Sequence, residues 1–225
     1  MNKVYPFSAC VFDLDGTLVD SLPGISHAVD FAIGKVVPGL SRKDLTPLIG
    51  PPIRHVFQSA VCGAVSEAQL DSLEKTFREA YDSEGWKQTK PYEGVGQTLQ
   101  TLMTIGVALF VLTNKPLHVA NRILANYGLN ECFRAVVGRE SGYPKFSSKP
   151  QAAEHLCRRF GLFGHRTLLI GDSEDDAQAA QQCSLCFAAA DYGYGQVSTK
   201  FSGYPHYRLT SFPDLLIMND RRSQL

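Results

Sequence analysis

The sequence has no excess of charge of either sign and no long hydrophobic run. Lys plus Arg and Asp plus Glu both number 22 among 225 residues. A protein that binds nucleic acid through phosphate attraction is usually basic, so this balance argues against such a partner. The longest apolar runs have the length of strands, well short of the roughly 20 residues that span a bilayer. We therefore expect no membrane partner, and because no secretory signal is visible we expect the cytoplasm.

The six cysteines and six histidines also lack the spacing of a metal site. Only Cys183 and Cys186 form a CxxC, and no second pair completes a zinc site. We expect all six cysteines to be reduced, packed side chains. No histidine has metal-ligand spacing or neighbours a plausible nucleophilic serine or cysteine. Neither residue type therefore marks a catalytic site.

What the chain does contain is a series of continuously apolar runs, typical of parallel strands covered on both faces. They occupy residues 9–15, 107–114, 134–138, 167–172 and 185–190. Amphipathic helical patterns lie between most of them, at 96–106, 116–128 and 149–161. Strands that alternate with helices predict a doubly wound (Rossmann-like) α/β sheet.

One interval breaks this alternation directly after the first strand. Between Asp20 and about Trp86 there is no convincing strand, and apolar residues recur with helical spacing in three segments, 25–36, 53–61 and 70–81. We interpret residues 20–85 as an all-helical cap domain inserted into a core made of 1–19 and 86–225. Asp20 and Ser21 are expected to cap its first helix.

Polar side chains gather where the predicted strands end, which is where open α/β sheets bind ligands. Asp13 and Asp15 follow the first strand and share one side, because alternate residues of a strand point the same way. Two adjacent carboxylates repel unless a cation pairs them. The other strand-end candidates are Thr113, Asn114, Lys149, Asp172 and Asp176.

These strand-end residues belong to four short segments: "DLDGT" (13–17), "LTN" (112–114), "SKP" (148–150) and "GDSEDD" (171–176). The segments occur in the order found in the haloacid dehalogenase superfamily. The chain resembles the phosphatase branch with a helical cap. The "GPP" at 50–52, "KPYEGV" at 90–95 and "DYGYG" at 191–195 look most like phosphoglycolate phosphatases. This resemblance implies five parallel strands in the order 5-4-1-2-3, a small phosphorylated metabolite as substrate, and a monomer or homodimer.

A carboxylate can attack phosphorus and form an acyl phosphate, and Mg²⁺ held by carboxylates neutralises the charge of the phosphate. Asp13 is the expected nucleophile and a Mg²⁺ ligand, and Asp172 is the second carboxylate ligand. By resemblance, Asp15 contributes its main-chain carbonyl to the metal. Its side chain would then protonate the leaving alcohol and later activate water.

The remaining strand-end residues are expected to bind phosphate or to support the metal. Thr113 and Asn114 would donate hydrogen bonds to phosphate oxygens, and Lys149 would supply positive charge. Asp176, four residues after Asp172 on a helix, would hold a metal-bound water or orient Lys149.

The cap would choose the substrate, since the core recognises only a phosphate. Arg54, in "GPPIRHV", matches an arginine that caps of this superfamily point at the substrate, and it could pair with the carboxylate of glycolate. Glu174 and Asp175 are expected to be solvated. Phosphoglycolate is the leading substrate. Pyrophosphate, a nucleoside monophosphate, a sugar phosphate and a catalytically silent binding protein are the alternatives.

Overall fold

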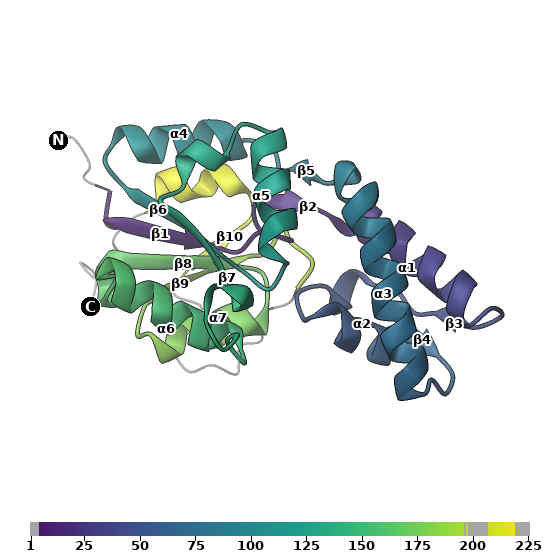
Figure 1. Cartoon of the computed structure of the whole chain (residues 1–225). Helices are drawn as coiled ribbons and strands as arrows, with labels where there is room; N and C mark the ends of the chain where they lie inside the picture. The colour runs from purple at the N-terminus through teal and green to yellow at the C-terminus, as the bar shows by residue number, and fades with distance from the viewer. Residues whose placement is uncertain (1–4, 196, 198–206, 219–225) are drawn as a thin grey trace.

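The computed structural model describes every residue except 1–4, 196, 198–206 and 219–225. The described chain forms a core built on a parallel sheet and a smaller, mainly helical cap beside one end of the strands (Figure 1). The chain leaves the core after the first strand and returns before the second, as the sequence predicted.

The core sheet has six strands in the order β10-β9-β8-β1-β6-β7, and every neighbouring pair is parallel. Five of them are the predicted strands, and their order is the 5-4-1-2-3 that the resemblance implied. The sixth strand, β10, was not predicted. The bounds are β1 Ala9–Phe12, β6 Ala108–Thr113, β7 Ala135–Gly138, β8 Thr167–Gly171, β9 Cys186–Ala190 and β10 Tyr207–Leu209.

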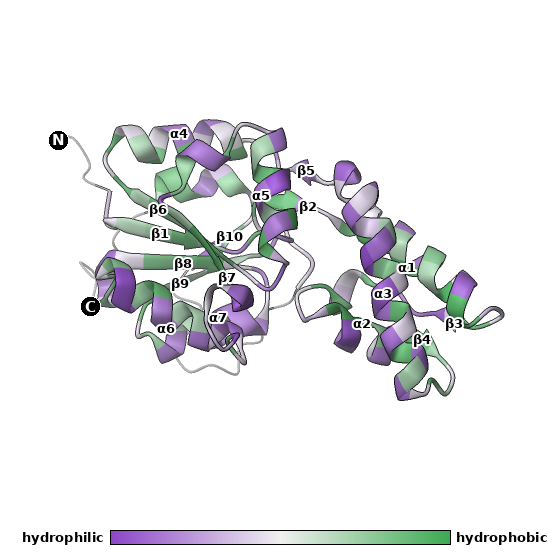
Figure 2. Ribbon diagram, in the orientation of Figure 1, coloured by the Kyte–Doolittle hydropathy of each residue, from purple (hydrophilic) through white to green (hydrophobic). Residues whose placement is uncertain are grey.

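The strands are apolar on both faces because helices cover both. Cys10 and Phe12 of β1 pack with helices α4 (Val95–Thr104) and α5 (Leu117–Asn126). Ala9 and Val11, which point the other way, pack with α6 (Lys149–Phe160) and α7 (Glu174–Gln182). Figure 2 shows these strands as the most continuously hydrophobic part of the core. Helix and sheet thus bury the runs that the sequence marked as two-sided strands.

The cap contains the three predicted helices, α1 (Leu22–Val36), α2 (Ile53–Ala60) and α3 (Glu67–Ser83). The buried side chains of α1 and α3 share one hydrophobic cluster. The expectation of an all-helical insert was wrong in one detail. Strands β3 (Ser41–Arg42) and β4 (Val61–Cys62), which lie before and after α2, form a short antiparallel pair. Strands of two residues are too short to leave a periodic pattern in the sequence.

The two passages of the chain between core and cap lie side by side and form a hinge. Strand β2 (Val19–Asp20) leads out of the core and pairs with β5 (Lys90–Pro91), which leads back. Asp20 Oδ1 accepts a hydrogen bond from Leu22 N at 3.1 Å, so Asp20 caps α1 as expected. Ser21 is the N-cap residue by position, but its side chain makes no capping hydrogen bond. That part of the prediction was wrong.

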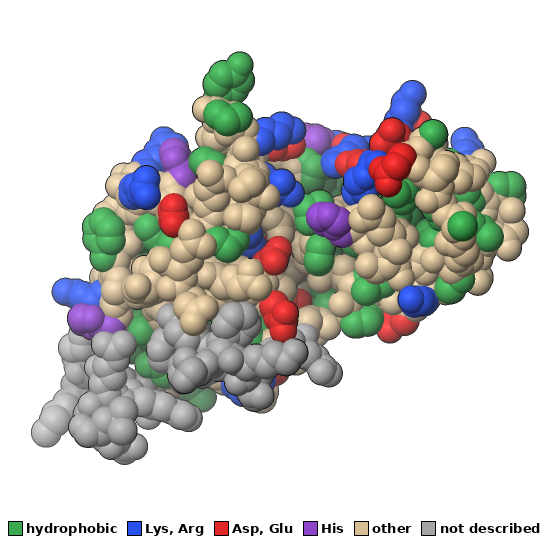
Figure 3. Space-filling model, turned by 90° about the horizontal axis from the view of Figure 1, so that it is seen from below, with side chains coloured by type: hydrophobic (Ala, Val, Ile, Leu, Met, Phe, Trp, Pro, Cys, Tyr) green, Lys and Arg blue, Asp and Glu red, His purple; other side chains and the backbone are tan. Residues whose placement is uncertain are grey.

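Short 3₁₀ turns complete the described chain: η1 Thr46–Leu48, η2 Gly85–Gln88, η3 Asn130–Cys132, η4 Arg139–Ser141, η5 Gly164–Arg166 and η6 Phe212–Ile217. Among the described residues, no helix has both the length and the apolar character needed to cross a bilayer. Acidic and basic side chains are interspersed over the face shown in Figure 3, in keeping with the balanced composition.

Candidate active site

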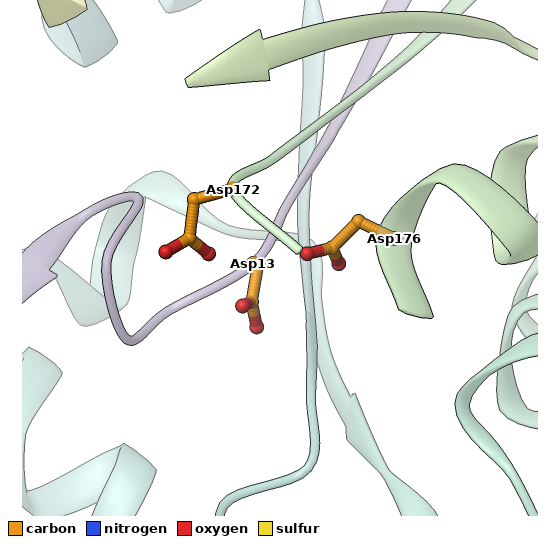
Figure 4. A group of neighbouring side chains, drawn as sticks. All are labelled: Asp13, Asp172 and Asp176. Carbon is orange, nitrogen blue, oxygen red and sulfur yellow. The ribbon is translucent and has the colours of Figure 1, made fainter. Parts of the chain in front are cut away.

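Three aspartates meet at the carboxyl ends of the central strands. Asp13 follows β1, Asp172 follows β8, and Asp176 lies in the first turn of α7. All three side chains are buried, and one oxygen of each lies within 4.8 Å of the others. Figure 4 shows the three carboxylates around a common space, although Asp13 is far from Asp172 and Asp176 in the sequence. The parallel register of β1 and β8 brings them to the same edge.

Lys149, the first residue of α6, partly balances this negative charge. Its Nζ lies 2.7 Å from Asp13 Oδ1 and 2.6 Å from Asp176 Oδ1. Burial by itself lowers the pKa of Lys149, but the charges of the two aspartates outweigh it and raise the pKa above its ordinary value. Lys149 is therefore an ammonium at neutral pH. Its contact with Asp176 fits the expectation that Asp176 orients this lysine.

Burial lowers the pKa of a lysine, but it raises the pKa of an aspartate. It raises the pKa of Asp13 well above the ordinary value, although the Lys149 ammonium opposes the shift. Burial, together with the charge of Asp176, raises the pKa of Asp172 to about 6. Three carboxylates facing one ammonium leave an excess of negative charge inside the protein. A cation would relieve it.

The oxygens of Asp172 support the presence of a cation site. Its Oδ2 accepts hydrogen bonds from Tyr194 N at 2.9 Å and Gly195 N at 3.1 Å. Its Oδ1 is buried and has no hydrogen-bond partner among the described residues. Leaving a buried carboxylate oxygen unpaired is costly, and oxygen donors are what Mg²⁺ prefers. The aspartate cluster therefore fits a hard divalent cation.

The side chain of Asp15 lies outside this cluster and is held separately. Its Oδ1 accepts from Ser21 Oγ at 2.5 Å and lies 2.8 Å from Lys115 Nζ. Both contacts use the same oxygen, which leaves Oδ2 without a hydrogen bond to the described residues. Asp15 lines the cavity between core and cap. This position suits a group that exchanges a proton with a ligand rather than one that binds the metal through its side chain.

Lys115 and Ser21 are site residues that the sequence reasoning missed. The Lys115 side chain is only 6% exposed, and its Nζ lies 4.7 Å from the centre of the Tyr81 ring of the cap. Burial lowers the pKa of Lys115, but the Asp15 charge outweighs this and raises it. The signal was present, because Lys115 directly follows Thr113 and Asn114 at the same strand end.

Thr113 and Asn114 lie at the site, where both form hydrogen bonds within the protein. Thr113 Oγ1 accepts from Lys115 N at 3.0 Å, so the hydroxyl hydrogen can still be donated to a ligand. Asn114 Nδ2 donates to Gly50 O at 3.0 Å and to Asp175 Oδ2 at 3.1 Å. Asn114 therefore ties the core to the "GPP" segment of the cap. Asp175 is half-buried and accepts this bond, so the expectation that it is solvated was wrong.

A cavity of about 310 Å³ lies between core and cap, bounded on the core side by Asp13, Asp15, Thr113, Asn114 and Lys115. Apolar cap side chains form much of the opposite wall: Ile25, Ile49, Ile53, Val56, Phe77 and Tyr81. This volume suits a small metabolite.

Arg54, the predicted specificity residue of the cap, does not line this cavity. Its guanidinium pairs with Asp71 at 2.6 Å, Glu67 at 2.5 Å and, more distantly, Glu74 at 3.7 Å. All three acids belong to α3, so Arg54 joins two cap helices. The structure thus places it away from the position that the resemblance implied.

Other cations line the cavity. Arg78 pairs with Glu74 at 2.7 Å, and Lys145 lies 3.6 Å from Glu140. Arg139, directly after β7, donates from Nε to Phe146 O at 3.0 Å and has no acidic partner among the described residues. Its terminal nitrogens are therefore available for an anion.

The family model of haloacid dehalogenase-like hydrolases matches residues 7–184. A phosphoglycolate phosphatase of Mannheimia succiniciproducens is 29% identical over 218 residues, which cover 93% of this chain and 97% of the relative. A 5'-nucleotidase of Pseudomonas aeruginosa is 30% identical over 188 residues, 82% of this chain and 83% of the relative.

A similar solved structure is that of a predicted phosphoglycolate phosphatase from Haemophilus somnus. Its TM-score is 0.80 at 26% identity, with 94% of this chain and 97% of that one covered. The likeness thus extends over core and cap together.

Proposed function

Because the chain belongs to the family of haloacid dehalogenase-like hydrolases, and its relatives include phosphatases, we propose that it hydrolyses a phosphate monoester with Mg²⁺ through an aspartyl-phosphate on Asp13. The observation that carries this proposal is the buried cluster of Asp13, Asp172 and Asp176, in which Asp172 Oδ1 has no hydrogen-bond partner within the described part of the chain.

Asp13 and Asp172 would hold the cation, with the main-chain carbonyl of Asp15 as the resemblance implies. The bound ion would neutralise phosphate charge near the nucleophile. Asp176 would act through Lys149, which it contacts at 2.6 Å.

In the first step an Asp13 oxygen attacks phosphorus, and the bond to the leaving oxygen breaks. Lys149, 2.7 Å from Asp13, balances the charge of the phosphate oxygens, and the Thr113 hydroxyl donates to one of them. Asp15 gives a proton from Oδ2 to the leaving alkoxide, and the second step returns that proton.

In the second step Asp15, now a carboxylate, takes a proton from the water that attacks the phosphorus of the aspartyl-phosphate. Inorganic phosphate leaves, and the Asp13 carboxylate is restored. Ser21 and Lys115 position Asp15 by binding Oδ1, so Oδ2 serves both proton transfers.

Phosphoglycolate is the proposed substrate. Two relatives named above bear that enzyme's name, and the terminal guanidinium nitrogens of Arg139, which bond to no described residue, can pair with the carboxylate of glycolate. Arg139 thus takes the role first assigned to Arg54. The 5'-nucleotidase relative keeps a nucleoside monophosphate as an alternative, and pyrophosphate and sugar phosphates also stay open. The cytoplasmic location and a monomeric or dimeric state stay predictions.

The test of the chemistry is phosphate release from a panel of these compounds with Mg²⁺, comparing wild type with Asp13→Asn. We expect the variant to lose turnover, because an amide is too poor a nucleophile to attack phosphorus. Turnover like that of the wild type in Asp13→Asn would overturn the mechanism. A wild type that hydrolyses no member of the panel would favour the silent binding protein.

The test of the substrate compares Arg139→Ala with Arg54→Ala as a matched control. Loss of one charge-assisted pair should lower kcat/KM for phosphoglycolate roughly ten- to a hundred-fold in Arg139→Ala. An aryl phosphate without a carboxylate should be little affected. If both substrates were weakened alike, Arg139 would support the phosphate or the fold rather than read the carboxylate.

A further inference from the structure

The segment "DYGYG" (191–195) contributed to the sequence resemblance, but the chemistry proposed above gives its side chains no role. It lies beside the metal-binding cluster. The backbone N–H groups of Tyr194 and Gly195 donate to Asp172 Oδ2 at 2.9 and 3.1 Å. These two bonds occupy one oxygen of the carboxylate and leave Oδ1 facing the cluster without a partner among the described residues. The orientation of Asp172 thus depends on the position of this loop.

The side chain of Tyr194 reaches the other way, to the hinge of the cap. Its hydroxyl accepts hydrogen bonds from Ser21 N at 2.5 Å and Leu22 N at 3.0 Å. The same hydroxyl donates to Asp20 Oδ1 at 2.6 Å. A tyrosine hydroxyl has one donor and two acceptor positions, so all three are used. Tyr194 therefore caps α1 together with Asp20, whereas the Ser21 side chain does not.

Close packing holds the loop against the metal-ligand segment at one end of this connection. A Cβ on Gly16 would lie 2.1 Å from Asp172 Oδ2, one on Gly193 would lie 2.2 Å from Gly16 O, and one on Gly195 would lie 2.0 Å from Asp172 O. The loop therefore lies directly against the metal-ligand segment, with no space for a methyl group. A displacement of the hinge that moves the Tyr194 ring must be transmitted to Asp172 or break the contacts of the hydroxyl.

From these contacts we propose that Tyr194 is a positioning residue that couples the metal-binding carboxylate of Asp172 to the hinge of the cap. The coupling rests on the proposed metal site. When the hydroxyl of Tyr194 holds the start of α1, its backbone N–H holds Asp172 Oδ2 and directs Oδ1 at the cation. Coupling between two sites is reciprocal, so a bound cation must also stabilise the contacts of Tyr194 at the hinge.

The other tyrosine of the loop does not make this link. Tyr192 OH donates to Thr17 O at 2.8 Å, which anchors the loop to the core. Among the described residues, Tyr194 is the side chain of this loop that bonds both to Asp20 and to the start of α1.

The first test measures Mg²⁺ binding to the full chain by titration calorimetry, without substrate, for wild type, Tyr194→Phe and Tyr127→Phe. The control loses a hydroxyl that donates to Thr89 O at 2.6 Å, beside the returning strand of the hinge but without contact to Asp172. We expect Tyr194→Phe to weaken Mg²⁺ binding about five-fold or more, the lower end of measured coupling between sites, and Tyr127→Phe to leave it unchanged.

The second test needs only the wild type. Hydrogen exchange of the Ser21 and Leu22 amides, which donate to the Tyr194 hydroxyl, should slow when Mg²⁺ binds. Equal Mg²⁺ affinity in wild type and Tyr194→Phe, or hinge amides that exchange at one rate with and without Mg²⁺, would overturn the coupling alone. A wild type that binds no Mg²⁺ would overturn the proposed metal site as well.

Discussion

Replacing Lys149 with methionine should expose the cost of gathering three buried carboxylates. The Lys149 side chain is 2% exposed and contacts Asp13 and Asp176, whose side chains are 4% and 0% exposed. Methionine keeps much of the volume but removes the positive charge. Removing one partner of a buried ion pair typically costs about 3–5 kcal/mol, because it leaves an uncompensated charge. That is a large part of the stability of an ordinary domain, about 5–15 kcal/mol.

The loss of folding stability in Lys149→Met should depend on pH in a defined direction. The pKa of Lys149 is raised, so this residue is charged in both folded and unfolded states below about pH 9, given an ordinary value near 10.4. The pKa values of Asp13 and Asp172 are raised by burial, to about 6 for Asp172. An acid with a raised folded pKa takes up a proton on folding, so its destabilising effect is present above that pKa and fades as the pH falls through it. The cost of Lys149→Met should therefore be largest near pH 8 and smaller at pH 5.

Urea unfolding at both pH values, with and without Mg²⁺, measures this. Lys87→Met is the matched control, since Lys87 and its partner Glu84 are 52% and 74% exposed and such pairs contribute about 0–1 kcal/mol. Mg²⁺ at a hundred times its Kd should restore about 2.7 kcal/mol. A loss no greater than in the control, or one equal at both pH values, would refute the reasoning.

Three further outcomes are expected. Lys115→Met should slow the hydrolysis of esters with poor leaving groups by up to about 10²–10⁴-fold, and that of nitrophenyl phosphate much less, because Lys115 positions the proton donor Asp15 and nitrophenolate needs no proton to leave. Equal slowing of both substrates would contradict this role. A chelator should stop phosphate release and Ca²⁺ should not restore it, since Ca²⁺ takes more ligands at longer distances; full activity with Ca²⁺ alone would exclude the proposed geometry. Gly16→Ala, at φ +79° and with its Cβ 2.1 Å from Asp172 Oδ2, should lower both Tm and Mg²⁺ affinity, whereas Gly96→Ala, with nothing within 4 Å, should change neither. Thermal unfolding and calorimetry measure the two quantities, and equal values for both variants would contradict this expectation.

The strand-end residues show how far short-range patterns lead. Asp13, Asp172 and Lys149 were predicted as a cluster because each ends a strand or begins a helix at the same edge of a parallel sheet. That inference needs only strand direction and the rule that ligands bind at carboxyl ends. For Asp176 the sequence left two roles open, holding a metal-bound water or orienting Lys149, and its contact with Lys149 Nζ at 2.6 Å fits the second.

Which arginine of the chain lines the cavity could not be predicted in this way. Arg54 was selected by its place after a glycine, yet acids 13 to 20 residues further along the chain bind its guanidinium on the surface of the cap. Arg139 was not selected from the sequence, although it directly follows the predicted strand 134–138, and it lines the cavity without an acidic partner among the described residues. Which arginine is free depends on how α3 packs on α2 and on how the cap lies over the core. Neither arrangement can be predicted from a local sequence pattern.

By itself, the sequence determined the alternation of strands and helices, the place of the cap and the carboxylates at the strand ends, because apolar periodicity and strand direction act over a few residues. Only the tertiary structure decided that Lys115 and Ser21 hold Asp15, and that Tyr194 joins Asp172 to the start of α1. The contacts of the Tyr194 hydroxyl span 172 to 174 positions of sequence. Such bonds form because close packing brings distant segments within 3 Å, where a buried polar group must take whichever partner the fold supplies.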